Sequence, residues 1–97
     1  MPQGLHGVMP PMTTPFRADG EMALDAVAAQ VDFLIGAGAH GLAAGGSTGE
    51  GHAIDAGEFR ALIEATVAAA AGRVPVIAGV IVDSTRDAVR RGKAGRD

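Results

Sequence analysis

The sequence predicts an α/β fold in which the strands of a parallel sheet alternate with helices. Three apolar runs flanked by Gly or Pro start at residues 6, 41 and 76, so successive runs are 35 residues apart. Helical patterns fill both intervals and follow the third run, an alternation typical of parallel sheets. Eight such units give roughly 280 residues, the size of a (β/α)8 TIM barrel. The 97 residues therefore predict the first three βα units of an incomplete barrel, as one partial domain over 1–97.

The three apolar runs are the predicted strands, at 6–12, 41–46 and 76–82. The third run is apolar without interruption, as expected for a strand that is buried on both faces. The first run contains Pro10 and Pro11, which cannot donate hydrogen bonds to a ladder. That strand is therefore expected to be irregular or to end early.

The first predicted helix follows the first strand, since apolar residues recur there with helical spacing on one face. These residues are Leu24, Val27, Ala28, Val31, Leu34 and Ile35. Gln30 and Asp32 fall outside that face, and Gly36 and Gly38 are expected to end the helix.

The second predicted helix begins near Asp55, where Glu58 three residues later completes a capping-box pattern. Gly72 and Pro75 bracket its exit. Its expected apolar stripe consists of Phe59, Leu62, Ile63 and Val67.

A third helix is expected to begin at Ser84, with Asp87 three residues later. Its pattern runs into the basic, glycine-interrupted segment that contains Arg90, Arg91, Gly92, Lys93 and Gly95.

Composition and charge exclude several classes of function. The net charge is −3 and basic residues cluster only at the end of the sequence, which argues against a nucleic-acid partner. Cysteine is absent, so neither a disulfide framework nor thiolate chemistry is expected. No apolar stretch approaches the ~20 residues of a membrane span, and no secretory leader is visible. A cytoplasmic protein without a membrane partner is the expectation.

Polar and glycine-rich segments follow each predicted strand: Thr13-Thr14, then residues 45–51, then 83–85. The C-terminal ends of parallel strands share one edge, so these segments are expected on a single rim. Glycines on both sides of Ser47 and Thr48 would let backbone N–H groups converge on an anion, while the hydroxyls add donors. A carboxylate or phosphate is the expected ligand, and a glycine-rich turn without a ligand is the alternative.

Five short motifs occur together at intervals typical of one enzyme family. They are Gly7-Val8, Thr14-Pro15-Phe16, Asp19-Gly20, Gly46-Ser47-Thr48-Gly49-Glu50 and Pro75-Val76-Ile77-Ala78-Gly79. With these motifs, the sequence from Gly7 onward resembles the first third of the dihydrodipicolinate synthase / N-acetylneuraminate lyase family, the class I pyruvate-dependent aldolases.

The resemblance implies a Schiff-base mechanism on pyruvate or a related 2-keto acid, in a full-length parent that forms homo-oligomers. In that family a lysine on the sixth strand forms the imine and a tyrosine on the fifth relays protons. The loop that matches Ser47 and Thr48 holds the pyruvate carboxylate through backbone N–H groups. The hydroxyl at the position of Ser47 joins the proton relay, and Thr14 lies near the base of the pocket. No cofactor and no metal is implied.

This chain does not contain the two residues that perform the covalent chemistry. It has no tyrosine, and its one lysine, Lys93, lies in the basic segment rather than at the end of a buried strand. Imine formation requires a desolvated lysine with a lowered pKa. We therefore expect no aldolase activity from this polypeptide alone. The alternative is a non-catalytic truncated product or interaction fragment, which binds anions weakly or self-associates through open sheet edges.

Two positions depart from the family pattern. Ile81 stands where the family commonly has glycine, and Asp83 stands where it commonly has asparagine. Ile81 fills space that glycine leaves open, and Asp83 adds negative charge near a site for an anion. A related aldolase or dehydratase with another acceptor therefore fits as well as dihydrodipicolinate synthase. Ser47, where synthases often carry threonine, is more typical of the neuraminate-lyase branch.

Two other patterns in the sequence are associated with binding sites. Residues 36–41 match G-x-G-x-x-G, but a helix precedes them and a strand follows, the reverse of the dinucleotide-binding order. His40, Glu50, His52 and Asp55 lack the helical i, i+4 pair of histidines typical of a metal site, so loop histidines are the expected interpretation.

Overall fold

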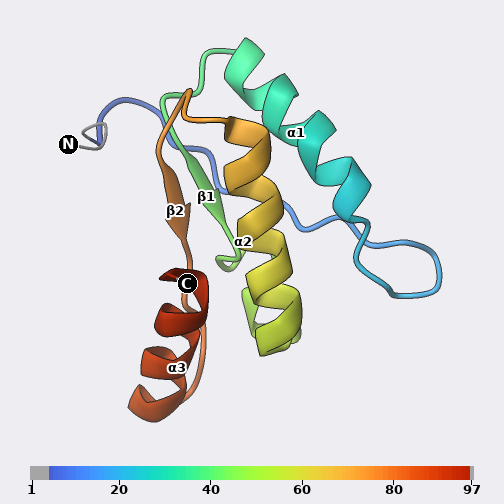
Figure 1. Ribbon diagram of the computed structural model, residues 1–97, viewed down its shortest axis with the longest axis vertical. Coiled ribbons are helices and arrows are strands. Elements are labelled where there is room, and N and C mark those ends of the chain that lie inside the picture. The colour runs from blue at the N-terminus through green and yellow to red at the C-terminus, as the bar shows by residue number, and fades with distance from the viewer. Residues whose placement is uncertain (1–4, 97) are drawn as a thin grey trace.

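The computed structural model describes residues 5–96. Its elements in chain order are α1 (Leu24–Gly36), β1 (Leu42–Ala44), the 3-10 turn η1 (Gly51–Ala53), α2 (Ala56–Ala70), β2 (Val76–Ala78) and α3 (Thr85–Arg96). Helices α1 and α2 lie together on one side of the two strands, and α3 lies beyond the strand ends (Figure 1). No helix within residues 5–96 combines the length and apolar character that crossing a membrane requires.

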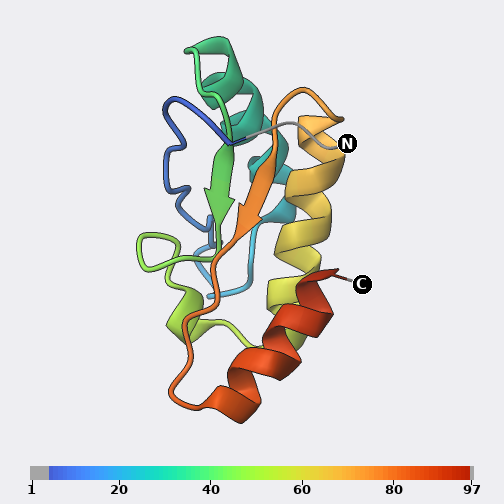
Figure 2. The same ribbon diagram turned by 90° about the vertical axis from the view of Figure 1, so that its left-hand side faces the viewer.

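The two strands pair in parallel, with Ala43 opposite Ile77 at the centre of the register. The segment that contains Pro10 and Pro11 runs along the other edge of β1 (Figure 2). It makes an isolated parallel bridge between Pro11 and Ala43, and the Met12 N–H donates to the Ala43 carbonyl at 2.7 Å. The strand expected at 6–12 is therefore irregular, as predicted, because the two prolines have no N–H to donate.

The prediction of a strand over 76–82 is wrong beyond Ala78, where β2 ends. One further ladder bond follows, from the Gly79 N–H to the Ala44 carbonyl at 2.8 Å. At Gly45 the backbone of the neighbouring strand enters the left-handed region, with φ +74°, and leaves the sheet. Pairing with β1 therefore stops there for both strands, which also shortens the strand predicted at 41–46.

The prediction that the third run is buried on both faces is also wrong for this chain. Val76 and Ile77 are half-buried and Ala78 is exposed. The helices cover only one face of the strands (Figure 1), so the side chains that point to the other face keep solvent contact.

The hydrophobic core lies between α1, α2 and β1. Its largest fully buried side chains are Phe59, Met12, Leu42, Leu62, Val27 and Val31. Leu24 and Ala28, both predicted on the buried face of α1, are exposed, Leu24 by 39% because it stands in the first turn of that helix.

The apolar stripe of α2 differs from the prediction at one position. Phe59, Leu62 and Ile63 are buried as expected, but Val67 is 52% exposed and Thr66 is fully buried in its place. The Thr66 hydroxyl donates to the Leu62 carbonyl at 2.8 Å, so burial leaves it with a partner.

The predicted helix starts of α2 and α3 are confirmed. The Glu58 N–H donates to the Asp55 carboxylate at 2.8 Å, and the Asp55 N–H donates to the Glu58 carboxylate at 3.0 Å, which completes the capping box of α2. The Asp87 N–H donates to the Ser84 hydroxyl at 3.1 Å in front of α3. These caps satisfy N–H groups that a helix start leaves without a partner.

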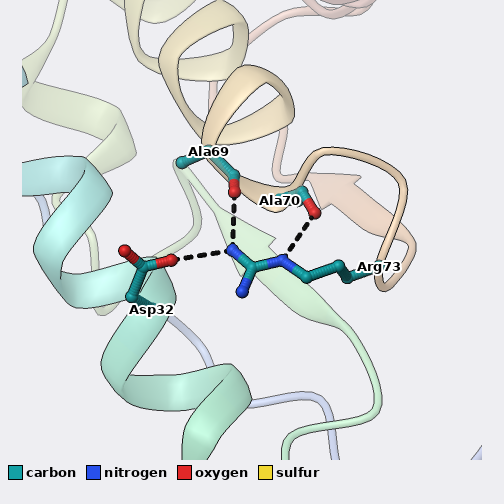
Figure 3. Close-up of polar contacts among 4 residues, drawn as sticks. All are labelled: Asp32, Ala69, Ala70 and Arg73. Atoms are coloured by element: carbon teal, nitrogen blue, oxygen red, sulfur yellow. Dashed lines mark hydrogen bonds and ion pairs between the residues drawn. The ribbon is translucent and has the colours of Figure 1, made fainter.

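Arg73 fixes the exit of α2 against α1 (Figure 3). Its guanidinium donates to the carbonyls of Ala70, at 3.1 Å, and Ala69, at 2.7 Å, in the last turn of α2. The same group pairs with Asp32 on α1 at 2.7 Å. A cation at this end of a helix is favourably placed with respect to the helix dipole. The contacts set where the chain turns back from α2 into β2.

Candidate functional site

The loop of residues 45–51 lies at the C-terminal ends of both strands (Figure 2). It follows β1 directly, and at its start Gly46 contacts Gly79, the residue that follows β2. An ideal Cβ built on Gly79 would lie 2.6 Å from the Gly46 Cα, so the two backbones are in direct contact. The rim predicted from the sequence therefore brings the loop against the end of the second strand.

The loop is a closed turn with both ends tied together. The Gly51 N–H donates to the Gly46 carbonyl at 2.9 Å, and the Glu50 N–H donates to the Ser47 carbonyl at 3.1 Å. Glu50 adopts a left-handed conformation, with φ 57°, which reverses the chain before η1. These bonds fix the backbone on either side of Ser47 and Thr48.

Ser47 and Thr48 are exposed at the tip of this turn. In the part of the chain that the structure describes, their backbone N–H groups donate to no protein acceptor. Two adjacent N–H groups without a protein acceptor and two exposed hydroxyls are donors of the kind that bind anions in turns. These donors can serve a carboxylate or phosphate oxygen.

Thr14 supports the loop from beneath. The residue is 5% exposed and its hydroxyl donates to the Gly49 carbonyl. An ideal Cβ on Gly49 would lie 2.8 Å from the Met12 carbonyl oxygen, so the loop also packs directly on the segment that precedes Thr14. The structure thus brings Thr14 into contact with the predicted loop, although its hydroxyl is engaged with the protein rather than directed to solvent.

Arg91 also contacts the loop, although the sequence indicated it only as part of the basic segment. From α3 its guanidinium donates to the carbonyls of Gly51, at 2.7 Å, and Ile54, at 2.8 Å. It also lies over the Phe59 ring, with 5.1 Å between the guanidinium carbon and the ring centroid. Forty residues separate Arg91 from Gly51, so no local pattern could have indicated this contact.

The remaining polar residues considered from the sequence do not converge on the loop tip. His52 is exposed on η1, and Lys93 is exposed on α3. Asp83 is exposed just before α3. His40 lies at the opposite end of β1, where its Nδ1 accepts the Val8 N–H at 2.9 Å.

A hollow of about 460 Å³ also lies at the opposite end of the strands from the loop. Its lining includes Ala39 and His40, which precede β1, and Val74 and Pro75, which precede β2. Because it is formed where the strands begin, it is not part of the rim that carries Ser47 and Thr48.

Comparison with known proteins identifies the family of this chain. Residues 4–97 match the model of the dihydrodipicolinate synthetase family. The chain belongs to this family. It is 40% identical over 94 residues to 4-hydroxy-tetrahydrodipicolinate synthase from Methanosphaerula palustris, and 44% identical over 86 residues to the enzyme of that name from Cereibacter sphaeroides. These matches cover 95% and 89% of this chain but 32% and 29% of those relatives.

Solved structures of the family have the same fold over this region. The chloride-inhibited dihydrodipicolinate synthase from Acinetobacter baumannii, complexed with pyruvate, matches with a TM-score of 0.89 at 31% identity, over 94% of this chain and 31% of that one. N-acetylneuraminate lyase from Mycoplasma synoviae matches with a TM-score of 0.84 at 28% identity, over 93% of this chain and 31% of that one. The predicted fold, the first three βα units of a TIM barrel, is thereby confirmed. The chain spans about a third of the length of the family members that it matches.

Proposed function

We infer that this chain is the N-terminal part of a pyruvate-dependent lyase or aldolase of the dihydrodipicolinate synthetase family, and that the loop of residues 45–51 binds the carboxylate of its 2-keto acid. The observation that carries the inference is the loop tip, where the Ser47 and Thr48 N–H groups have no protein acceptor within residues 5–96. A carboxylate offers oxygens to both groups, and charge-assisted hydrogen bonds of this kind are the strong ones.

The proposed roles follow from the position of each residue. Ser47 and Thr48 bind the carboxylate through their backbone N–H groups, and the exposed Ser47 hydroxyl is free to relay a proton. Thr14 holds the loop in place, because its buried hydroxyl donates to the Gly49 carbonyl beneath the tip. The Acinetobacter baumannii relative, whose fold matches over this region, was solved with pyruvate, which supports a keto acid as the ligand.

The proposed reaction divides between this loop and residues outside the chain. A lysine amine attacks the keto carbon and water leaves, which gives an imine that accepts electrons from C3. The loop contributes the fixed carboxylate, which holds the reacting carbon in position. Lys93 is exposed on α3 and not buried near the loop tip, so it lacks the desolvation that would lower the pKa of an imine-forming lysine. We therefore propose that this polypeptide alone binds the keto acid without turning it over.

A second candidate is a non-catalytic interaction fragment that self-associates or binds anions weakly. The observation in its favour is the open edge of β2, which pairs only with β1 among the described residues. Cytoplasmic location and homo-oligomeric assembly of the full-length parent belong to the primary proposal.

The carboxylate site is tested by titrating the isotope-labelled chain with pyruvate and following the amide signals. We expect saturable shifts at Ser47 and Thr48, and none with methyl pyruvate, which has no carboxylate. Ser47→Ala removes the hydroxyl but keeps the backbone N–H group, so it should still bind pyruvate. The matched control Thr85→Ala, on α3, should bind pyruvate as the unchanged chain does. Saturable shifts confined to another segment, or equal binding of the ester, would contradict the proposal.

Absence of turnover is tested separately. The chain is incubated with pyruvate and borohydride, which reduces any imine to a stable adduct, and its mass is then measured. We expect no adduct on Lys93. Trapped pyruvate at that position would show that the chain carries its own imine-forming lysine.

A further inference from the structure

The Arg91 side chain joins three parts of the molecule that meet beneath the loop. It extends from α3, its two terminal nitrogens donate to the carbonyls of Gly51 and Ile54 at 2.7 and 2.8 Å, and its guanidinium covers the Phe59 ring at 5.1 Å. Gly51 and Ile54 lie at the two ends of η1, and both are buried. The arginine therefore holds the 3-10 turn at both ends.

The same partners also define the loop that carries Ser47 and Thr48. The Gly51 N–H closes the loop onto the Gly46 carbonyl at 2.9 Å, while the Gly51 carbonyl accepts from Arg91. At the other end of the loop, an ideal Cβ on Gly45 would lie 3.1 Å from the Phe59 ring. Arg91 is therefore in contact with the residues that fix the loop at its start and at its end.

The chemistry of the contact requires arginine. Two carbonyls are held at once by a planar fork whose face lies on an aromatic ring, and the fork loses little freedom on binding. Lysine presents a single compact ammonium, which cannot hold both carbonyls and cover the ring in the same way. An aliphatic side chain would cover the ring but leave two buried carbonyls without this donor.

We propose that Arg91 is a positioning residue for the carboxylate-binding loop. It does not touch the ligand. It keeps the Ser47 and Thr48 N–H groups in the geometry that binds the carboxylate, by fixing Gly51, Ile54 and Phe59 from α3. The proposal rests on the proposed function for the ligand itself, but the order of the loop is measurable without any ligand.

The test compares pyruvate binding and loop order in three arginine variants. Arg91→Leu should weaken pyruvate binding about tenfold or more and increase the fast motion of the Ser47 and Thr48 amides, measured by nitrogen relaxation. Arg91→Lys should give an intermediate loss. Arg90→Leu is the matched control, because the Arg90 contact is an exposed ion pair with Asp87 at 3.7 Å, and it should bind as the unchanged chain.

A general loss of stability is separated from positioning by Val31→Ala, a truncation of a fully buried side chain on α1. This variant should lower the thermal midpoint while pyruvate binding at temperatures where it remains folded stays within twofold of the unchanged chain. If Arg91→Leu does not fold, the comparison of Arg91→Lys with Val31→Ala decides the question in the same way.

Two results would overturn the positioning role: pyruvate binding by Arg91→Leu within twofold of the unchanged chain, or equal losses of pyruvate binding in the two Arg91 variants and in Val31→Ala. If the unchanged chain does not bind pyruvate, the proposed function fails. The relaxation data then still test the role of Arg91. Greater mobility of the Ser47 and Thr48 amides in Arg91→Leu would support the positioning role, and unchanged amide mobility would refute it.

Discussion

At the scale of single residues, close contacts between backbone atoms at glycine positions hold the candidate site together. At Gly51 an ideal Cβ would lie 1.9 Å from the Gly45 carbonyl oxygen, and at Gly79 it would lie 2.6 Å from the Gly46 Cα. Neither neighbour is a flexible side chain that could move aside. The loop can rest against the end of β2 only because no side chain stands between them.

We expect Gly79→Ala to destabilise the chain by about 1–3 kcal/mol, because the added methyl group must displace the loop backbone. Gly46→Ala is the matched control, since an ideal Cβ there meets no atom within 4 Å and the change should cost roughly 0.5 kcal/mol or less. Urea unfolding followed by circular dichroism measures both. Equal midpoints for the two variants would contradict the close approach.

We expect Thr14→Val to cost about 1–3 kcal/mol, because it removes a buried donor and leaves the Gly49 carbonyl without it. Thr13→Val is the comparison: the Thr13 hydroxyl also donates, to the Gln30 side chain at 3.2 Å, but this bond is exposed, so its loss should cost roughly 0.5 kcal/mol or less. The free energies come from the same urea experiment, and amide shifts should change mainly around Gly49. A Thr14 variant as stable as the Thr13 variant would show that the buried bond contributes nothing.

At the scale of elements, local signals decide where helices begin, and packing decides which face is buried. The α2 capping box and the Ser84 contact before α3 use side chains within three residues of their partners, so spacing alone predicted them. Thr66 is buried where Val67 was predicted to be, because of how α2 is rotated about its axis against its neighbours. A threonine can be buried on a helix if its hydroxyl donates to its own helix, so the sequence does not show which of the two residues faces the core.

The capping box gives a prediction for α2. We expect Asp55→Ala to destabilise the chain by about 1 kcal/mol, because the Glu58 N–H loses its acceptor at the helix start. Asp83→Ala is the control, since Asp83 is also an exposed aspartate but caps no helix, and it should change stability by roughly 0.5 kcal/mol or less. Thermal unfolding measures both. A larger loss for the Asp83 variant would contradict the role given to Asp55.

At the scale of the whole molecule, one face and one edge of the sheet lack partners within residues 5–96. Helices cover a single face of the strands (Figure 1), and β2 pairs only with β1. The half-buried Val76 and Ile77 and the 37% exposed Val80 lie along this edge. An open parallel edge with apolar side chains is a template for pairing with another chain.

We therefore expect the 97-residue chain to self-associate at micromolar concentration, as measured by size-exclusion chromatography and sedimentation. Val80→Lys should shift the chain toward monomer, because a charge next to the edge opposes pairing. Val67→Lys is the control, since Val67 is an exposed apolar residue on α2 and not on the β2 strand. A monodisperse monomer that unfolds cooperatively, or an equal effect of both lysines, would refute association through the edge.

The alternation of strands and helices, the family, the helix starts and the segment that carries Ser47 and Thr48 could all be predicted from the sequence. Each of these rests on short signals, such as an apolar period, a cap or a glycine-rich motif, and on their spacing along the chain. Three features are seen only in the folded molecule: β2 stops at Ala78, Thr66 is buried instead of Val67, and Arg91 reaches the loop. These depend on contacts between segments tens of residues apart, whose free energy is set by how the elements pack and not by any local pattern.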